Sequence, residues 1–73
     1  MHEESLIAHL GKRIRHLRIS QNLPRTQLSK LCGVSVYRLD LIERGSFLEI
    51  DVLTLWTLAA VLNVPVSLLF RKG

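Results

Sequence analysis

A chain of 73 residues is long enough for one small domain with a limited core. Its formal charge of +4 suits a polyanionic partner, and eight of the ten basic side chains lie between residues 12 and 44. The single cysteine, Cys32, excludes an intrachain disulfide, and we expect it to be a small core residue. No stretch approaches the roughly 18 apolar residues of a membrane span, and residues 1–5 do not resemble a secretory signal. We therefore expect a cytoplasmic protein with no membrane partner.

The first two predicted elements are helices, and the first covers residues 5–19. Its apolar residues recur at helical spacing and define one face: Ile7, Leu10, Ile14 and Leu17. Its basic residues are expected to form a solvated face: Lys12, Arg13 and Arg15. Asn22 suits the left-handed conformation that ends a helix, and Pro24 suits the first turn of the next one. The second helix is short, because Gly33 follows Cys32 after about two turns.

The third helix is predicted to run from its N-cap, Ser35, to Arg44. Two short helices joined by a glycine turn at residues 33–35 are typical of a helix-turn-helix, because the glycine lets one helix cross the other. At about 100° per residue, Leu39 and Ile42 face the core together. The opposite face is then free to enter a DNA major groove, and it carries Val36, Tyr37, Asp40, Leu41 and Arg44.

A fourth helix is predicted over residues 52–62, with Asp51 as its N-cap and Asn63 closing it, and a short fifth helix over residues 66–70. The core-facing stripe of the fourth helix is expected to contain Val52, Leu55, Leu58, Ala59 and Leu62. These elements predict an all-α fold of five helices. We expect a single domain over residues 1–73, with its core over residues 6–70.

The helix-turn-helix segment carries a recognisable pattern. Residues 27–35 read Gln-Leu-Ser-Lys-Leu-Cys-Gly-Val-Ser and residues 39–45 read Leu-Asp-Leu-Ile-Glu-Arg-Gly. With the apolar segment 53–64, they resemble the phage-repressor and Cro-type (XRE) helix-turn-helix family over residues 10–70. The resemblance implies a lambda-repressor-like domain of five helices that binds double-stranded DNA.

The resemblance also implies roles for individual residues. The positions that match base-contacting residues are Ser35, Val36, Tyr37 and Leu41. Arg25 and Arg44 match phosphate contacts, and Arg38 is expected to contact DNA at the flank of the third helix. Arg18 and Glu43 match a partly buried ion pair that ties the first helix to the third.

Some residues depart from the family pattern. Arg25 replaces a usual glutamine and, as a charged donor, can hold a phosphate more strongly. Val36 and Leu41 have no hydrogen-bonding group, so they suit thymine methyl groups and cannot distinguish guanine edges. Asp40 is unfavourable near phosphates unless it pairs with Arg44 one turn on or accepts from a cytosine amino group.

A second apolar surface lies beside the core stripe of the fourth helix. We expect a homodimer contact there, built from Phe47, Leu48, Leu53, Trp56 and Phe70, with Val66 as a further candidate. Burial of these side chains in the domain's own core is the alternative. A two-fold dimer would place two third helices roughly 34 Å apart, which matches a pseudo-palindromic site.

The leading interpretation is a transcriptional regulator, a repressor that binds operator DNA as a dimer. The alternative is a protein-interaction module of the same fold that docks a partner through its apolar faces. The sequence fits three biological contexts of such a regulator equally well: a phage regulator, a restriction–modification controller and an antitoxin. His2, His9 and His16 recur at intervals of seven residues, about 10 Å apart in a helix, which is too far to share a metal, and we expect them to be exposed. With no catalytic constellation, we expect no enzyme activity, cofactor, metal or small-molecule ligand.

Overall fold

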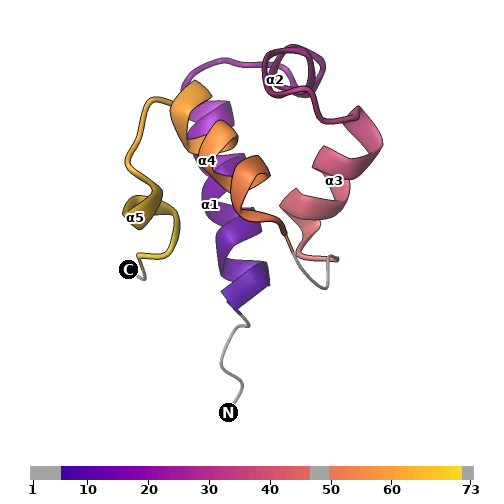
Figure 1. Ribbon diagram of the computed structural model, residues 1–73. Helices are drawn as coiled ribbons and strands as arrows, with labels where there is room; N and C mark the ends of the chain where they lie inside the picture. The colour runs from indigo at the N-terminus through magenta and orange to yellow at the C-terminus, as the bar shows by residue number, and fades with distance from the viewer. Residues whose placement is uncertain (1–5, 47–49, 72–73) are drawn as a thin grey trace.

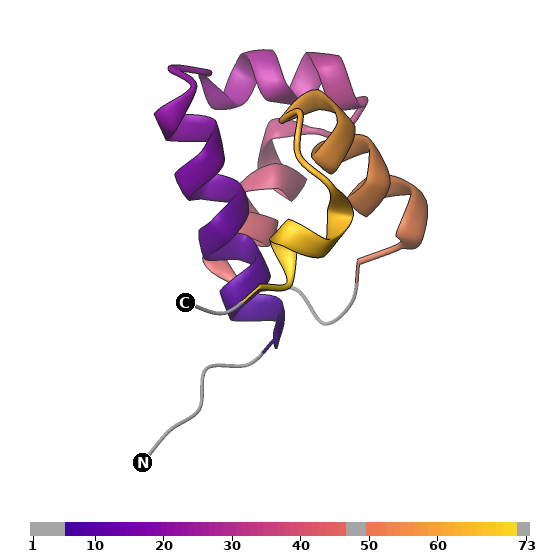
Figure 2. The same ribbon diagram turned by 90° about the vertical axis from the view of Figure 1, so that its left-hand side faces the viewer.

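Five α-helices make up the described part of the chain, residues 6–46 and 50–71 of a computed structural model. They are α1 (Leu6–Ser20), α2 (Arg25–Cys32), α3 (Val36–Arg44), α4 (Val52–Val61) and α5 (Val66–Leu69). Within these residues there is no strand, so the predicted all-α class is confirmed. Helix α1 packs against α3 and α5, and α4 packs against α2 and α5 (Figures 1 and 2). The helices therefore surround one core.

The helix ends are set by local caps. Ser35 and Asp51 each accept a hydrogen bond from the backbone N–H three residues further on, at 3.0 Å, and so begin α3 and α4. Asn22 and Asn63, which follow α1 and α4, have left-handed φ values of 56° and 61°. These features confirm the predicted caps, although α4 and α5 each end one residue earlier than predicted.

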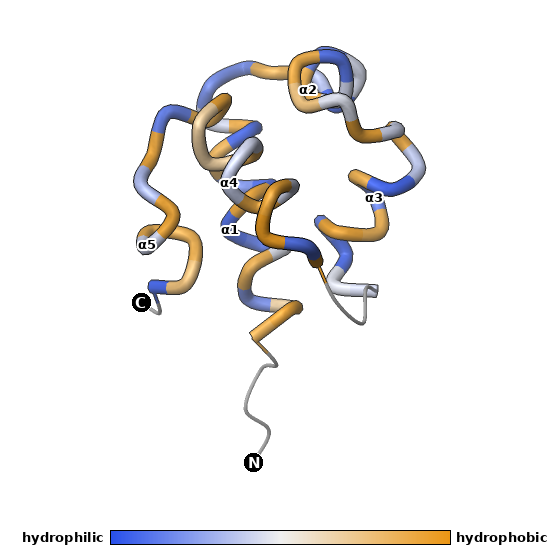
Figure 3. The backbone as a smooth tube through the Cα atoms, in the orientation of Figure 1, coloured by the Kyte–Doolittle hydropathy of each residue, from blue (hydrophilic) through white to orange (hydrophobic). Residues whose placement is uncertain are grey.

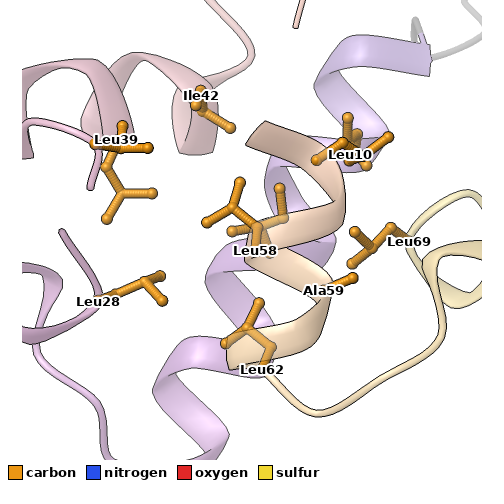
Figure 4. Close-up of a cluster of buried hydrophobic side chains, with 11 residues drawn as sticks. Leu10, Leu28, Leu39, Ile42, Leu58, Ala59, Leu62 and Leu69 are labelled. Atoms are coloured by element: carbon orange, nitrogen blue, oxygen red, sulfur yellow. The ribbon is translucent and has the colours of Figure 1, made fainter. Parts of the chain in front are cut away.

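The core consists mainly of leucine and isoleucine side chains drawn from all five helices (Figure 4), with Val34 and Ala59. The largest fully buried ones are Ile14, Leu28, Leu39, Leu58, Leu62 and Leu69. Burial of each such side chain stabilises the fold by about 1.5–3 kcal/mol relative to exposure. Half-buried Cys32 packs at the edge of this core.

Helix α4 is apolar along most of its length (Figure 3), but only one of its faces is buried. The prediction that Val52 belongs to the core is wrong, since 70% of this residue is exposed. Val52 lies about 90° from the centre of the buried stripe at roughly 100° per residue, so it points past the core. Leu53 and Trp56 are 76% and 62% exposed, which excludes their burial in the domain's own core.

Other predictions are corrected by the packing of α5 against the first helix. His9 is half-buried and not exposed, because its ring contacts the backbone carbonyl of Arg71. Val66 packs against the core, whereas Phe70 is 38% exposed. His2, Phe47 and Leu48 lie outside the described residues. Among the described residues, no helix is both long enough and apolar enough to span a membrane.

Helices α1 and α3 approach each other at a glycine. A Cβ atom on Gly11 would collide with the backbone carbonyl oxygen of Ile42, and it would also touch the carbonyl of Glu43. Only a glycine therefore allows this contact between the two backbones. The close approach sets α1 against the C-terminal half of α3, where the polar contacts of the candidate site are found.

Candidate nucleic-acid interface

The turn between α2 and α3 has the conformation of a helix-turn-helix. Gly33 ends α2 with a left-handed backbone, φ 68° and ψ 27°, which glycine adopts without strain. The Val34 N–H donates to the carbonyl of Ser29 at 3.2 Å, and the Val34 side chain is buried in the core. Ser35 then caps α3. These contacts hold α3 across α2 with its outer face free (Figure 1).

The outer face of α3 presents the residues that the sequence indicated. Leu39 and Ile42 are buried, whereas Tyr37 is 73% exposed and Val36 is 41% exposed. Leu41 is half-buried at the edge of this face. The groups that this face exposes are thus the phenol of Tyr37, the short aliphatic side chain of Val36, the hydroxyl of Ser35 and the guanidinium of Arg44.

Arg18 and Glu43 form the ion pair expected between the first and third helices. Arg18 Nε donates to Glu43 Oε2 at 2.6 Å, and Arg18 Nη2 donates to Glu43 Oε1 at 3.0 Å. The third nitrogen of Arg18, Nη1, donates to the carbonyl of Leu23 at 3.0 Å. Because the Glu43 side chain is only 1% exposed, this bidentate pair is part of the interior.

Arg25 extends this pair into a network, which the sequence analysis did not foresee. Its Nε lies 3.1 Å from Glu43 Oε1, and its Nη1 lies 3.9 Å from Asp40 Oδ1. Arg44 Nε pairs with Asp40 Oδ2 at 3.0 Å, which is the i, i+4 contact that the sequence indicated. The negative charge of Asp40 is therefore compensated from two sides.

Arg38 makes a second contact that the sequence analysis missed. Its Nη2 donates to Asp51 Oδ1 at 3.1 Å, so the third helix is tied to the N-cap of the fourth. Hydrogen bonds from the Thr54 hydroxyl and then from the Thr54 N–H hold the pKa of Asp51 below its usual range. Asp51 is consequently a carboxylate at neutral pH, and Arg38 faces a full negative charge.

The site consists of an exposed helical face flanked by guanidinium groups. Within the residues that the structure describes, no group of three histidine, cysteine or acidic side chains could hold a metal ion. An exposed helix of major-groove size with arginines at its ends is suited to contact bases and phosphates. The fold and the site together define the class of protein, a helix-turn-helix DNA-binding regulator.

Comparison with known proteins gives the family. The chain belongs to the Helix-turn-helix family, whose model matches residues 14–69, and this confirms the resemblance to the XRE type. It is a DNA-binding transcription regulator by family and fold, and proteins of that kind are not enzymes. No curated protein matches the chain.

Three solved structures illustrate the similarity. The restriction-modification controller protein C.AhdI from Aeromonas hydrophila is 26% identical, with a TM-score of 0.82 over 88% of this chain and 96% of that one. SinR from Bacillus subtilis, in complex with DNA, is 29% identical, with a TM-score of 0.80 over 85% of this chain and 98% of that one. The clp gene regulator ClgR from C. glutamicum is 25% identical, with a TM-score of 0.85 over 92% and 86% of the two chains.

Proposed function

We propose that the protein is a repressor that binds a pseudo-palindromic operator as a homodimer, with α3 in the major groove. The observation that carries this proposal is the face of α3, whose Tyr37 is 73% exposed while Leu39 on the opposite side is fully buried. A side chain held outward by a rigid helix can reach base edges. The similarity to SinR, which has been solved in complex with DNA, supports DNA binding by this chain.

The proposed base contacts come from one side of the helix: Ser35, Val36, Tyr37 and Leu41. Tyr37 and Ser35 supply hydroxyl groups, and Val36 supplies a methyl surface for thymine. The proposed phosphate contacts are Arg25, Arg38 and Arg44. Each of these arginines already contacts a carboxylate, so DNA phosphates would share or replace those partners.

The dimer part of the proposal rests on the exposed apolar side chains of α4. Val52, Leu53 and Trp56 are each more than half exposed, and Phe70 adds a further exposed ring. A large aromatic side chain in water is unusual for a monomer, and aromatic residues are enriched at the centre of protein contacts. Two copies related by a two-fold axis would cover these side chains.

A binding experiment with two variants tests the DNA-binding mode. Sequences selected by the protein from a random duplex pool would provide the operator, against which Tyr37→Ala and Arg44→Gln are compared by fluorescence anisotropy. Tyr37→Ala should change the preference at one base position by about 1–3 kcal/mol. Arg44→Gln should weaken binding to all duplexes alike. It should also reduce the magnitude of the slope of log K against log salt by about one unit.

The same experiment can contradict the proposal. If the protein binds duplex DNA weakly at every salt concentration, phosphate contacts do not contribute to binding. The proposal that the protein binds an operator is then wrong. The exposed Leu53 and Trp56 would then favour the alternative, a module that docks another protein. If both variants lose affinity equally on all sequences, Tyr37 positions the helix and does not read a base.

A further inference from the structure

A groove with a volume of about 620 Å³ runs beside α1 and the C-terminal half of α3. Lys12, Arg15 and His16 line its α1 side, and Arg25 and Arg44 line the opposite side. The α1 residues lie at i, i+3 and i+4, which places them together on one face of that helix. The sequence analysis treated Lys12 and Arg15 as part of a solvated face, but the packing of α1 against α3 makes them one wall of a groove.

The charges in the groove favour an anion. Two carboxylates line it as well, Asp40 and Glu43, but both are engaged with arginines at the distances given above. Arg18 also neutralises Glu43 from behind the groove wall. The side chain of Arg15 therefore adds positive charge to a wall whose negative charges are already compensated. A bound anion would meet a net positive surface.

The groove is continuous with the proposed DNA interface. Arg25 and Arg44, the proposed phosphate contacts at the two helices of the helix-turn-helix, are also part of its lining. Duplex DNA carries one negative charge per about 1.7 Å of its axis, so a backbone that passes these two arginines brings neighbouring phosphates with it. Arg15 presents a guanidinium fork that matches a phosphate, and Lys12 presents a point charge.

We propose that this groove is a phosphate-binding site that extends the DNA interface from the helix-turn-helix onto α1, with Arg15 as its principal new contact. The inference rests on the proposed function, since phosphates reach the groove only when α3 lies in the major groove. Lys12 and His16 are the supporting contacts. The site adds affinity for any duplex and no preference among sequences, because phosphates are the same at every step.

The helix that carries Arg15 also offers a matched control. Arg13 lies two residues away, about 200° around α1, and its Nη2 donates to the carbonyl of Arg71 at 2.7 Å on the side of α5. It does not line the α1–α3 groove. Arg13→Gln and Arg15→Gln therefore remove the same charge from the same helix, but only Arg15→Gln removes it from the proposed site.

The experiment measures the salt dependence of binding for the full chain and a fluorescent random-sequence duplex, between about 50 and 200 mM salt. We expect Arg15→Gln to reduce the magnitude of the negative slope of log K against log salt by about one unit. Arg13→Gln should leave the slope as in the wild type. Circular dichroism and thermal unfolding check that both variants are folded. If Arg15→Gln does not fold, Arg15→Met, which keeps the length of the side chain and removes its charge, takes its place with the same expected change.

Three outcomes would overturn the inference. Equal losses of slope for both variants would show a general charge effect with no specific site. An unchanged slope for Arg15→Gln, while the wild type remains strongly salt-dependent, would remove the groove from the interface and leave the proposed function intact. A wild type that binds duplex DNA weakly at all salt concentrations would overturn the proposed function and the groove together.

Discussion

The guanidinium group of Arg38 and the carboxylate of Asp51 lie 3.1 Å apart and join α3 to the start of α4. The same carboxylate caps α4 through two hydrogen bonds from Thr54, at 3.0 Å to its N–H and 2.7 Å to its hydroxyl. Asp51 thus has two roles that can be separated by substitution. One is structural, and in the proposed complex with DNA the other would compete with phosphates for Arg38.

We expect Asp51→Asn to strengthen binding to all duplexes by about twofold to fivefold, because it removes an exposed ion pair of Arg38, and such pairs are weak. Asparagine caps a helix as well as aspartate does, so stability should change little. Asp51→Ala is the control, because it also removes the carboxylate beside Arg38 but should destabilise the fold through the loss of the cap. Anisotropy and urea unfolding measure the two effects. Weaker binding by Asp51→Asn would show instead that Asp51 holds Arg38 in its DNA-contacting position.

The cap also predicts a pH dependence of stability. The folded-state pKa of Asp51 is lowered, chiefly by the Thr54 hydroxyl, so its contribution is complete above the unfolded-state pKa of about 3.9. That contribution is lost as the pH falls below this value towards the lower folded-state pKa. We expect the wild type to lose stability relative to Asp51→Asn below about pH 4, with a constant difference above about pH 5. Urea unfolding at a series of pH values measures this. A constant difference at all pH values would contradict the contribution of the cap.

Glu43→Gln should destabilise the fold by about 3–5 kcal/mol, because it leaves the buried Arg18 without a counter-charge. The control is Asp40→Asn on the same helix, whose pairs with Arg25 and Arg44 are more exposed and should be worth under about 1 kcal/mol. Denaturant unfolding compares the two variants. Similar losses for both would mean that the Arg18–Glu43 pair contributes no more than a surface pair.

Gly11→Ala should destabilise the protein even though alanine favours helices by about 1 kcal/mol over glycine. The new methyl group would collide with the carbonyl of Ile42 and push α1 away from α3, at a cost of about 1–3 kcal/mol or more. Gly33→Ala is the comparison: it meets no atom within 4 Å, and its cost should come only from its left-handed backbone. Thermal unfolding compares the stabilities of these two variants with that of the wild type. A Gly11→Ala protein more stable than the wild type would show that α1 and α3 adjust freely.

Trp56→Glu should convert the proposed dimer into a monomer, because each subunit would place a carboxylate near its symmetry copy. The fold should survive, since 62% of Trp56 is exposed in the single chain. Sedimentation and circular dichroism measure these two properties, and operator affinity should fall. Ser20→Glu, an exposed position at the end of α1, controls for the added charge. A Trp56→Glu protein that stays dimeric would place the interface elsewhere.

Features that depend on interactions within a few residues could be predicted from the amino-acid sequence alone. The periodic apolar residues predicted the helices, and Ser35 and Asp51 were identified as N-caps because capping uses backbone groups only three residues away. The Asp40–Arg44 pair was predictable for the same reason, since its partners are one helical turn apart. The outer face of α3 was predicted from the same periodicity of apolar residues.

The partners of charges on different helices depend on tertiary packing, and only the Arg18–Glu43 pair was expected beforehand, from the family resemblance. Arg25 meets Glu43, and Arg38 meets Asp51, across 18 and 13 positions of sequence. Neither pair has a local signal, because its distance depends on how two helices cross. The groove beside Arg15 likewise depends on how α1 packs against α3, and these two helices approach each other closely at Gly11. The crossing of rigid helices, set by the shapes of packed side chains, places these charges, and periodicity within one helix carries no information about it.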